Sequence, residues 1–385
     1  MSQKKLSKFK VAHLTSAHPR DDIRIFHKQC LSLERAGFSV LLVVADGLGS
    51  GATRGIEVHD VGLSRGRVDR VLRVCRLVFR KAVELDADLY HLHDPELLWV
   101  GLMLQRRGKR VVFDSHEDVP LQLLGKPYLN PAVRGLVAKF YRVGERFCCK
   151  RFSGVIAATP TIRDKFLAIH SKTVDICNFP MLEEFATNVQ WADKMDEVCY
   201  VGGLSKIRGL WEMVAAMNIL PGTTRLNLVG GFSSPQDREL ICREPGWSRV
   251  NETGVLDRAG VAAVYRRSFA GLVTLRPLPN YIEALPIKMF EYMAAGIPVI
   301  ASNFPLWESI VADHRCGLCV DPDDVRAIAD VIVKLAASPD EARAMGENGR
   351  RAVLTIYNWK AEETKLIAFY AELLSISPES VNKEV

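Results

Sequence analysis

The chain has 385 residues, of which 48% are hydrophobic and 25% are charged, a composition typical of globular proteins rather than of disordered or fibrous ones. The net charge of +6 is unevenly divided: residues 1–178 hold 30 lysines and arginines against 18 acidic residues, whereas residues 179–385 hold 21 against 27, so an anionic surface would meet the first half. No apolar run of roughly 18 residues and no secretory leader pattern are present, so we expect a cytoplasmic protein without a membrane span.

Short β-branched runs alternate with helical patterns in the first half of the chain. The runs VAHLTSA (11–17), SVLLVVA (39–45), DLYHLHD, RVVFDSHE and GVIAATP read as strands, and a helical pattern near 25–36 follows the first of them. This alternation predicts a parallel, doubly wound sheet, and we assign residues 1–178 to a first Rossmann-like domain that binds the acceptor.

The first strand-to-helix loop, SAHPRDDIRIFHK (16–28), is polar and charged instead of glycine-rich. Ligands of open α/β sheets bind beyond the carboxyl ends of the strands, so its Asp22 and Arg24 are candidates for the acceptor side. The alternative is that they cap the helix that follows. The loop contains no paired glycines.

Two more strand ends in this half carry polar side chains suited to a ligand. HLHDPE contains His93 and Asp94, and DSHED contains His116. A histidine at a strand end can orient a sugar hydroxyl or act as an acid or base near neutral pH. A structural role remains open for His93 on equal terms.

Two helical stretches of the first half are strongly basic. Residues 65–84 and 132–152 each carry five or more lysines and arginines at helical spacing beside aliphatic residues. Such helices can lie on an anionic inner-membrane surface. They also fit solvated helices packed on a sheet, and the two interpretations stay open. No recognition helix or aromatic platform accompanies the charge, so we expect no nucleic acid partner.

The pattern is interrupted at residues 179–196, which are acidic and irregular, and we predict a linker there. Strand-like runs then resume over 197–205, 225–231, 250–256, 271–277, 297–302 and 317–322, which predicts a second Rossmann-like domain over 197–358. Residues 359–385 are expected to form a helix that returns to the first domain, followed by a tail. The predicted fold is therefore α/β, with two doubly wound domains facing each other across a cleft.

The loop after the first strand of the second half, YVGGLSKIRGLWEMV (200–214), combines glycines with Lys206 and Arg208 ahead of a helix. Glycines such as Gly203 allow close backbone approach, and cations at a helix start favour a diphosphate. The spacing matches neither a dinucleotide fingerprint nor a P-loop. The alternative is a tight turn with solvated basic residues.

The stretch NYIEALPIKMFEYMAAGIPVIAS (280–302) places Glu283 in a loop and Glu291 inside the helix after it. Pro286 suits the first helical turn, and Gly296 with Pro298 suits a helix stop. Carboxylates beside an anion site fit a ligand that carries sugar hydroxyls as well as phosphate, because a carboxylate is a strong acceptor. A dipole-complementing Glu283 and a solvated Glu291 are the alternative.

Four patterns that invite a metal or anchor are assigned to structure instead. Asp86 and Asp88 precede their strand, at the wrong end of the sheet, and Asp321 with Asp323 precedes a helical pattern, where we predict an N-terminal cap. The Cys316–Cys319 pair lacks two further zinc ligands. The adjacent pair Cys148–Cys149 is expected in a core, because the odd count of nine cysteines favours reduced, buried thiols over disulfides or acylation.

Together these stretches resemble the retaining glycosyltransferases of family 4, of the two-domain GT-B type, which build bacterial surface polysaccharides and glycolipids. The resemblance covers nearly the whole chain and is strongest in NYIEALPIKMFEYMAAGIPVIAS, which matches the E-x7-E signature of that family. It extends through YVGGLSKIRG, VFDSHED, HLHDPELL, CGLCVDPDD and YNWKAEE.

The resemblance implies a role for individual residues. Glu291 would bind the ribose, Glu283 and His116 the donor sugar, and Arg208 the diphosphate. The backbone near the donor and its base would come from Ala284, Leu285, Gly254 and Leu256. Gly203 stands where many relatives have a second diphosphate-binding arginine, so Lys206 is the expected substitute.

The resemblance also implies the reaction: transfer of a hexose-type sugar from a UDP- or GDP-linked donor to an acceptor hydroxyl with retention of configuration. The acceptor would be a glycan or a lipid-linked saccharide, and no metal and no cofactor would be needed. A nucleotide-sugar epimerase of the same fold and a catalytically silent subunit of a polysaccharide-assembly complex are the alternatives.

Overall fold

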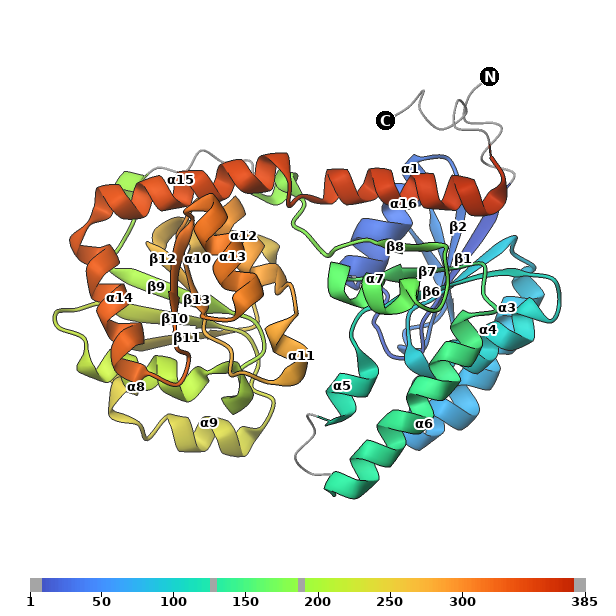
Figure 1. Cartoon of the computed structure of the whole chain (residues 1–385), viewed down its shortest axis with the longest axis horizontal. Helices are drawn as coiled ribbons and strands as arrows, with labels where there is room; N and C mark the ends of the chain where they lie inside the picture. The colour runs from blue at the N-terminus through green and yellow to red at the C-terminus, as the bar shows by residue number, and fades with distance from the viewer. Residues whose placement is uncertain (1–8, 125–129, 186–190, 377–385) are drawn as a thin grey trace. The chain divides into compact units, whose positions relative to one another are not determined.

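The computed structural model describes residues 9–124, 130–185 and 191–376. By its contacts the chain divides into two compact units (Figure 1). The first comprises Met1–Asn178 and Lys360–Val385, and the second comprises Phe179–Trp359. The predicted linker 179–196 falls within the second unit in this division, and its residues 186–190 lie outside the described part of the chain.

The first unit is built on one eight-stranded sheet in the order β3-β4-β2-β1-β5-β6-β7-β8. Its strands are β1 Lys10–Leu14, β2 Ser39–Val44, β3 Gly51–Thr53, β4 Ile56–Asp60, β5 Leu89–Leu92, β6 Arg110–Ser115, β7 Gly154–Ala157 and β8 Thr173–Asp175. All neighbours but one pair in parallel. Runs such as VLLVV in β2 are continuously apolar because helices cover both faces of a parallel sheet.

The exception is the edge strand β3, which runs antiparallel to β4. The sequence analysis predicted parallel strands only, and this edge corrects it. Thr53 is followed by Arg54 (φ 49°) and Gly55 (φ 83°), two left-handed residues of the kind that closes a two-residue hairpin. The short hairpin ends the sheet at a point where no crossover helix is available.

Helices flank this sheet on both faces. They are η2 Ile23–Cys30, α1 Leu31–Arg35, α2 Arg67–Asp69, η3 Arg70–Val74, α3 Cys75–Leu85, η4 Pro95–Leu97, α4 Leu98–Gln105, α5 Val119–Leu124, α6 Pro131–Cys149 and α7 Pro160–Leu167. The C-terminal helix α16, Trp359–Leu374, packs on the same unit, as predicted: the His91 ring in β5 lies 2.7 Å from the Tyr370 hydroxyl. A Cβ at Gly154 would lie 2.5 Å from the Phe369 ring, so glycine is needed where α16 crosses β7.

The second unit contains a six-stranded, fully parallel sheet in the order β11-β10-β9-β12-β13-β14. The strands are β9 Glu197–Val201, β10 Arg225–Val229, β11 Val250–Gly254, β12 Ala270–Val273, β13 Val299–Ser302 and β14 Gly317–Val320. In order of appearance this is 3-2-1-4-5-6, the doubly wound arrangement, and the strand order reverses between β9 and β12. A ligand of such a sheet binds at that reversal.

The second unit's helices complete its layers. They are η5 Leu182–Phe185, η6 Trp191–Asp193, η7 Lys206–Arg208, α8 Leu210–Ile219, α9 Pro235–Ile241, η8 Pro245–Arg249, α10 Arg258–Arg267, α11 Pro279–Ile282, α12 Ile287–Ala294, α13 Pro305–His314, α14 Val325–Ala337 and α15 Pro339–Thr355. The cap of α14 is Asp324, which accepts from the N–H groups of Arg326 and Ala327, and this corrects the prediction of Asp321 and Asp323 as that cap. Asp323 instead pairs with Arg276 at 2.9 Å.

All nine cysteines are unpaired thiols, and Cys148 and Cys149 are buried in the core of the first unit. Within the described ranges, no helix has the length and apolar content that crossing a bilayer requires.

Candidate functional site

In the second unit, most of the predicted donor residues gather where β9 and β12 end side by side. The loop after β9 leads through Gly202 and Gly203 into η7 and α8, and the loop after β12 leads through α11 to Glu283 and the start of α12. The first N–H groups of α12 lack partners within the helix and favour an anion at its start. On each side of the reversal of strand order, a loop therefore leads into the start of a helix.

Glycine is required at two points of the first loop. Gly209 has a φ of 72°, and a Cβ there would lie 1.9 Å from the Thr274 carbonyl oxygen. Gly202 has a φ of 136°, and a Cβ there would lie 2.9 Å from the Lys288 ammonium nitrogen. Without side chains at these points, the loop after β9 can approach the loop after β12 and the start of α12.

Arg208 closes η7 and lies beside the backbone of Gly203, with 3.6 Å between its Cζ and the position of a Cβ on that glycine. Burial works against its charge, but the hydroxyls of Tyr200 and Tyr281, to which Arg208 is hydrogen-bonded, raise its pKa further. The guanidinium is thus a fixed positive charge held by two phenols.

Lys288, in the first turn of α12, is a residue that the sequence analysis missed. Its side chain is 6% exposed, and its Nζ lies 3.7 Å from the centroid of the Tyr200 ring. Among the described residues, that nitrogen has no hydrogen-bond partner. Burial first, and Arg208 second, hold the pKa of Lys288 well below its usual value. Its position in the motif was visible, but its proximity to Gly202 depends on the fold.

Glu291 is buried on α12 and its carboxylate is fixed from two sides. One oxygen accepts from Arg258 at 2.8 Å, and the other accepts from the Tyr265 hydroxyl at 2.8 Å. Arg258 also pairs with Glu184 of η5. A carboxylate offers about four acceptor positions, so two remain for ligand hydroxyls. The solvated position that was the alternative for Glu291 is wrong, because its side chain is only 5% exposed.

The loop between α11 and α12 is held by Trp307, whose indole N–H donates to the Ala284 carbonyl at 2.7 Å. The Ala284 N–H donates to the Tyr281 carbonyl, so both backbone polar groups of Ala284 are used within the protein. Glu283 is the C-terminal cap of α11 and is exposed, whereas Leu285 is half-buried. Pro286 is the cap of α12 rather than a residue of its first turn.

The other predicted donor residues lie farther out on this unit. Lys206 is exposed, with its Nζ 6.0 Å from the Trp211 ring centroid. Gly254 ends β11 with a φ of 71° and accepts from the Gly230 N–H at 2.8 Å, and Leu256 is half-buried just beyond it. A backbone hydrogen bond thus anchors the Gly254 end of this loop.

In the first unit, histidines and Asp114 form one buried hydrogen-bond network at the strand ends. His13 Nδ1 lies 2.9 Å from His93 Nε2, and His93 Nδ1 lies 3.4 Å from His116 Nε2. His116 Nε2 in turn lies 3.0 Å from Asp114. The reversal of strand order in this sheet falls between β1 and β5, so the network occupies its ligand-binding edge.

Arg24 extends the network by donating two hydrogen bonds to the Asp114 carboxylate, of 2.7 and 3.0 Å. Burial alone would raise the pKa of Asp114, but Arg24 and His116 outweigh it and hold that pKa well below its usual value. Burial lowers the pKa of His93 to about 3. His93 is therefore neutral at pH 7 and links its neighbours, while the half-buried His116 faces outward.

The remaining acceptor-side candidates are engaged within the first unit. Asp94 accepts from the Thr15 hydroxyl at 2.8 Å and from the backbone of the loop that follows β1. Asp22 caps η2 by accepting from the N–H groups of Arg24 and Ile25, which was the alternative kept open for it. These contacts give Arg24, Asp22 and Asp94 supporting positions beneath the loop, and an acceptor contact for them stays a prediction.

His93, Asp114 and His116 offer three atoms close enough to hold a metal ion. However, the Arg24 guanidinium occupies both carboxylate oxygens, and Gln29 donates to one of them at 2.8 Å. A fixed cation on the carboxylate competes with a metal for the same lone pairs. The donor set therefore fits an ion-paired network better than a metal centre.

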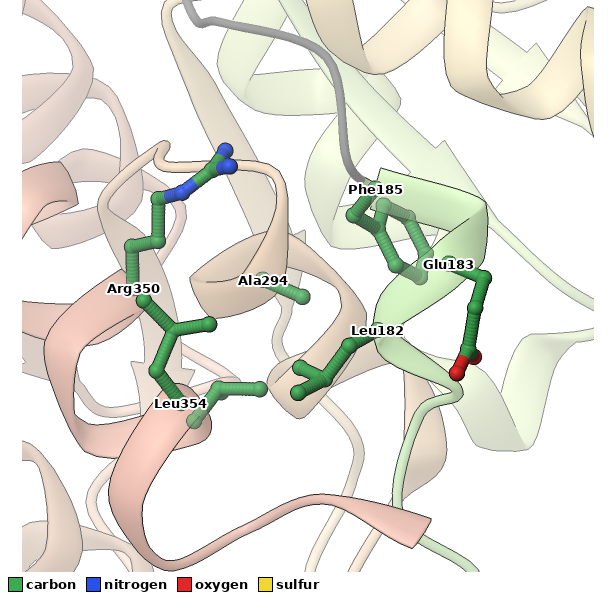
Figure 2. A pocket seen from close by; sticks show the side chains of 7 residues that line it. Leu182, Glu183, Phe185, Ala294, Arg350 and Leu354 are labelled. Carbon is green, nitrogen blue, oxygen red and sulfur yellow. The ribbon is translucent and has the colours of Figure 1, made fainter. Parts of the chain in front are cut away.

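The second unit also contains a hollow of about 260 Å³ on the far part of α12. Leu182, Phe185, Ala294, Val353 and Leu354 line it with Glu183 and Arg350 at its rim. Leu182 and Leu354 point toward each other across it, and the Glu183 carboxylate points away (Figure 2). It includes none of the predicted donor residues, and its apolar lining does not fit a nucleotide.

Two family models match the chain. "Glycosyl transferase 4-like domain" covers residues 24–180, and "Glycosyl transferases group 1" covers residues 183–352. The alpha-maltose-1-phosphate synthase of Mycolicibacterium smegmatis is 29% identical over 177 residues, which are 43% of this chain and 46% of that protein. The chain spans less than half the length of the curated relatives it matches.

Solved structures share the fold over almost the whole chain. A sucrose-phosphate synthase from Thermosynechococcus elongatus has a TM-score of 0.79 at 22% identity and covers 96% of this chain and 100% of its own. Anabaena Alr3699/HepE, solved in complex with UDP-glucose, has a TM-score of 0.71 at 17% identity, with 94% and 99% covered.

Proposed function

The chain belongs to the GT-B glycosyltransferases with a 4-like and a group 1 domain, and from this premise we propose that it transfers a sugar from a nucleoside diphosphate to an acceptor hydroxyl. The observation that carries the proposal lies at the strand reversal of the second unit: the half-buried Arg208 stands beside the start of α12, and the buried Glu291 lies on that helix. Fixed positive charge next to carboxylates suits a ligand that combines phosphates with hydroxyls.

The donor would be held along α12. The diphosphate would lie against Arg208 and the first N–H groups of that helix, and the ribose hydroxyls would donate to Glu291. Glu283, at the loop ahead of the helix, would accept from hydroxyls of the sugar. The loop from Gly254 to Leu256 would meet the base, and UDP and GDP donors both fit a loop that presents backbone. The relative with UDP-glucose shares the fold and leaves the choice of base open.

In the reaction, the bond between the sugar C1 and the β-phosphate oxygen breaks, and its electron pair leaves with the diphosphate. The acceptor oxygen forms the new bond to C1, and its proton passes to the departing phosphate. Arg208 and the helix N–H groups would stabilise the charge that develops on the leaving group. This arrangement supplies the charge that a divalent ion would otherwise bring, so we propose metal-independent transfer without a cofactor, with retention of configuration.

The first unit would receive the acceptor, a glycan or a lipid-linked saccharide. His116 would contact the donor sugar, and the neutral His93 and ionised Asp114 behind it would fix its ring. A lipid-linked acceptor fits the exposed apolar and basic face of α6, for which we propose contact with an anionic membrane surface.

The test uses the whole chain with UDP- and GDP-hexoses. Thermal shift identifies the donor, because a ligand that binds only the folded state raises the melting temperature. Transfer to a lipid-linked or free saccharide is then followed by release of the nucleoside diphosphate, with and without EDTA, and the anomer of the product is read by NMR.

Glu291→Ala and Arg208→Ala should abolish transfer while keeping the circular dichroism spectrum of the wild type. Full transfer by either variant, or a strict requirement for divalent cation, would contradict the mechanism. If incubation with donor alone yields an isomerised nucleotide sugar, the protein is an epimerase and the proposed transfer is wrong.

A further inference from the structure

We propose that Lys288 supplies the second cation that holds the donor diphosphate, the part for which the sequence pointed to Lys206. The inference rests on the proposed function, because it names a further residue of the same donor site. It assigns the site a ligand class by its charge: a pyrophosphate group placed between one guanidinium and one ammonium.

The geometry places both cations at one spot of the backbone. A Cβ built on Gly202 would lie 2.9 Å from the Lys288 Nζ and 3.6 Å from an Arg208 guanidinium nitrogen. Lys288 comes from the start of α12, and Arg208 comes from the loop after β9, so the two flank the strand reversal from opposite sides. A bridging anion at Gly202 would touch both.

The described residues provide no hydrogen-bond acceptor for the Lys288 nitrogen. The residue is 94% buried. The Tyr200 ring and the like charge of Arg208 lie near it, and the Glu291 carboxylate acts on it electrostatically without a hydrogen bond. Burying such a group without a partner costs free energy, so its presence points to a ligand that supplies the missing acceptors. Phosphate oxygens are acceptors of this kind.

Gly202 and Gly203 fit the same interpretation. A side chain on Gly202 would collide with the Lys288 nitrogen, and the φ of 136° at that residue disfavours one in any case. A Cβ on Gly203 would lie 3.6 Å from the Arg208 Cζ. The Lys288 nitrogen and the Arg208 guanidinium therefore lie beside the same stretch of backbone, which carries no side chains.

Lys206 is poorly placed for this task. It is exposed, and its nitrogen lies 6.0 Å from the Trp211 ring centroid. An exposed ammonium on a flexible stem binds a phosphate weakly, because water screens the charge and the side chain must be ordered.

Donor binding should also change the proton affinity of Lys288. Burial and Arg208 lower its pKa in the empty site and outweigh Glu291, which raises it, and a diphosphate beside Lys288 favours the charged form. Binding in the pH range between the two pKa values therefore takes up a proton. Calorimetry in two buffers of different ionisation enthalpy measures that uptake directly.

The experiment compares Lys288→Met, Lys206→Met and the distant control Lys334→Met in the full chain. The probes are UDP and GDP, the corresponding nucleoside monophosphates, and inorganic pyrophosphate. We expect Lys288→Met to weaken binding of the nucleoside diphosphate by roughly ten- to a hundredfold, as loss of a charged hydrogen bond does, with a much smaller effect on the monophosphate. Its proton uptake should vanish, while its melting temperature without ligand should not fall.

Wild-type affinity in Lys288→Met, or a loss confined to Lys206→Met, would overturn the inference. Should Lys288→Met fail to fold, Lys288→Gln carries the same test. Nucleotide binding that does not depend on Lys288 would contradict the role proposed for this residue and leave the proposed function unaffected. If the wild type binds pyrophosphate through Lys288 but no nucleotide, the anion site is supported and the proposed donor is wrong. Failure to bind any probe removes both.

Discussion

The phenolic hydroxyl of Tyr265 donates to the Glu291 carboxylate at 2.8 Å, from a position 26 residues earlier in the chain. Arg258, at the start of the same helix α10, holds the other carboxylate oxygen at 2.8 Å. The carboxylate that we assign to the ribose is thus fixed before any ligand arrives. Preorganisation of this kind lowers the entropic cost of binding.

Tyr265→Phe should weaken binding of a ribonucleoside diphosphate several-fold, because it frees one side of the carboxylate, and it should lower the free energy of unfolding by about 1 kcal/mol. The 2′,3′-dideoxy analogue lacks the hydroxyls that would donate to Glu291. Tyr265→Phe should therefore hardly change the affinity of the protein for this analogue. Calorimetry with both ligands measures the difference. Tyr357→Phe, which removes a hydroxyl bonded to His314 at 3.0 Å, is the matched control. Equal losses for both ligands would contradict the ribose assignment.

The stability of the protein should fall as the pH drops below about 6.5. Burial holds the pKa values of His13, His91 and His93 below the usual value, to about 3 for His93. These histidines therefore bind protons in the unfolded chain before they do so in the folded one. Below the pKa of the unfolded chain, each histidine lowers the free energy of unfolding by up to roughly 1.4 kcal/mol per pH unit. This loss continues until the pH reaches the pKa of that histidine in the folded protein.

Other groups act on the same window. His18 has a raised pKa because it is hydrogen-bonded to Asp22, so it stabilises the fold at low pH and opposes part of the trend. Asp114 has a lowered pKa, and its contribution is lost only at still lower pH, as it becomes protonated. Urea unfolding between pH 5 and 8 measures the slope, and His93→Gln should reduce it by about one proton. A flat profile would contradict the burial of neutral histidines.

The strands and the ligand-binding loops were predictable because their signals are local. Alternating β-branched runs gave the strand positions, and the polar residues after β5, β6, β9 and β12 follow from the rule that ligands lie at carboxyl ends. The edge hairpin and the strand at the other edge, β8, were missed because β3 and β8 are only three residues long and their strand patterns are weak. The cap of α14 was misplaced because Asp321, Asp323 and Asp324 stand within four residues, and each of them suits a helix cap.

The partners of the site residues could not be predicted, because each pair joins distant parts of the chain. Arg24 meets Asp114 across 90 residues, and Arg258 meets Glu291 across 33. Lys288 lay inside a quoted motif, but nothing in the spacing tells that its nitrogen reaches Gly202. Only the order of the strands brings β9 beside β12 and so makes these contacts local in space.

Arg24→Met should lower the free energy of unfolding by roughly 3–5 kcal/mol, because it leaves the buried Asp114 carboxylate without its cation. The double variant Arg24→Met/Asp114→Asn should recover part of that loss, since it removes the stranded charge. Arg20→Met is the control: its partner Asp46 is near the surface, and the cost should stay within about 1 kcal/mol. Similar losses for the two single variants, measured by urea unfolding at pH 7, would contradict the special role of Arg24.

The last prediction concerns the face that α6 turns away from the first unit. Its exposed apolar residues recur at helical spacing: Val133, Leu136, Val137, Phe140, Val143 and Phe147. Figure 1 shows this helix extending beyond the sheet that it flanks. Lysines and arginines stand along the same helix, and exposed aromatic residues among basic ones fit the boundary of an anionic bilayer better than water.

The stretch 65–84 fits a membrane less well, because two of its arginines are already paired: Arg70 with Glu96 and Arg73 with Asp69. Replacing Phe140 and Val143 by serine should therefore reduce sedimentation with anionic vesicles at low salt several-fold, whereas Leu72→Ser, on the other stretch, should not. High salt should weaken binding of the wild type, because part of the attraction is electrostatic. Donor binding should stay unchanged in both variants, since none of the replaced residues is assigned to the donor. If Phe140→Ser/Val143→Ser sediments like the wild type, α6 faces something other than lipid, and the basic charge of this half must be explained by another partner.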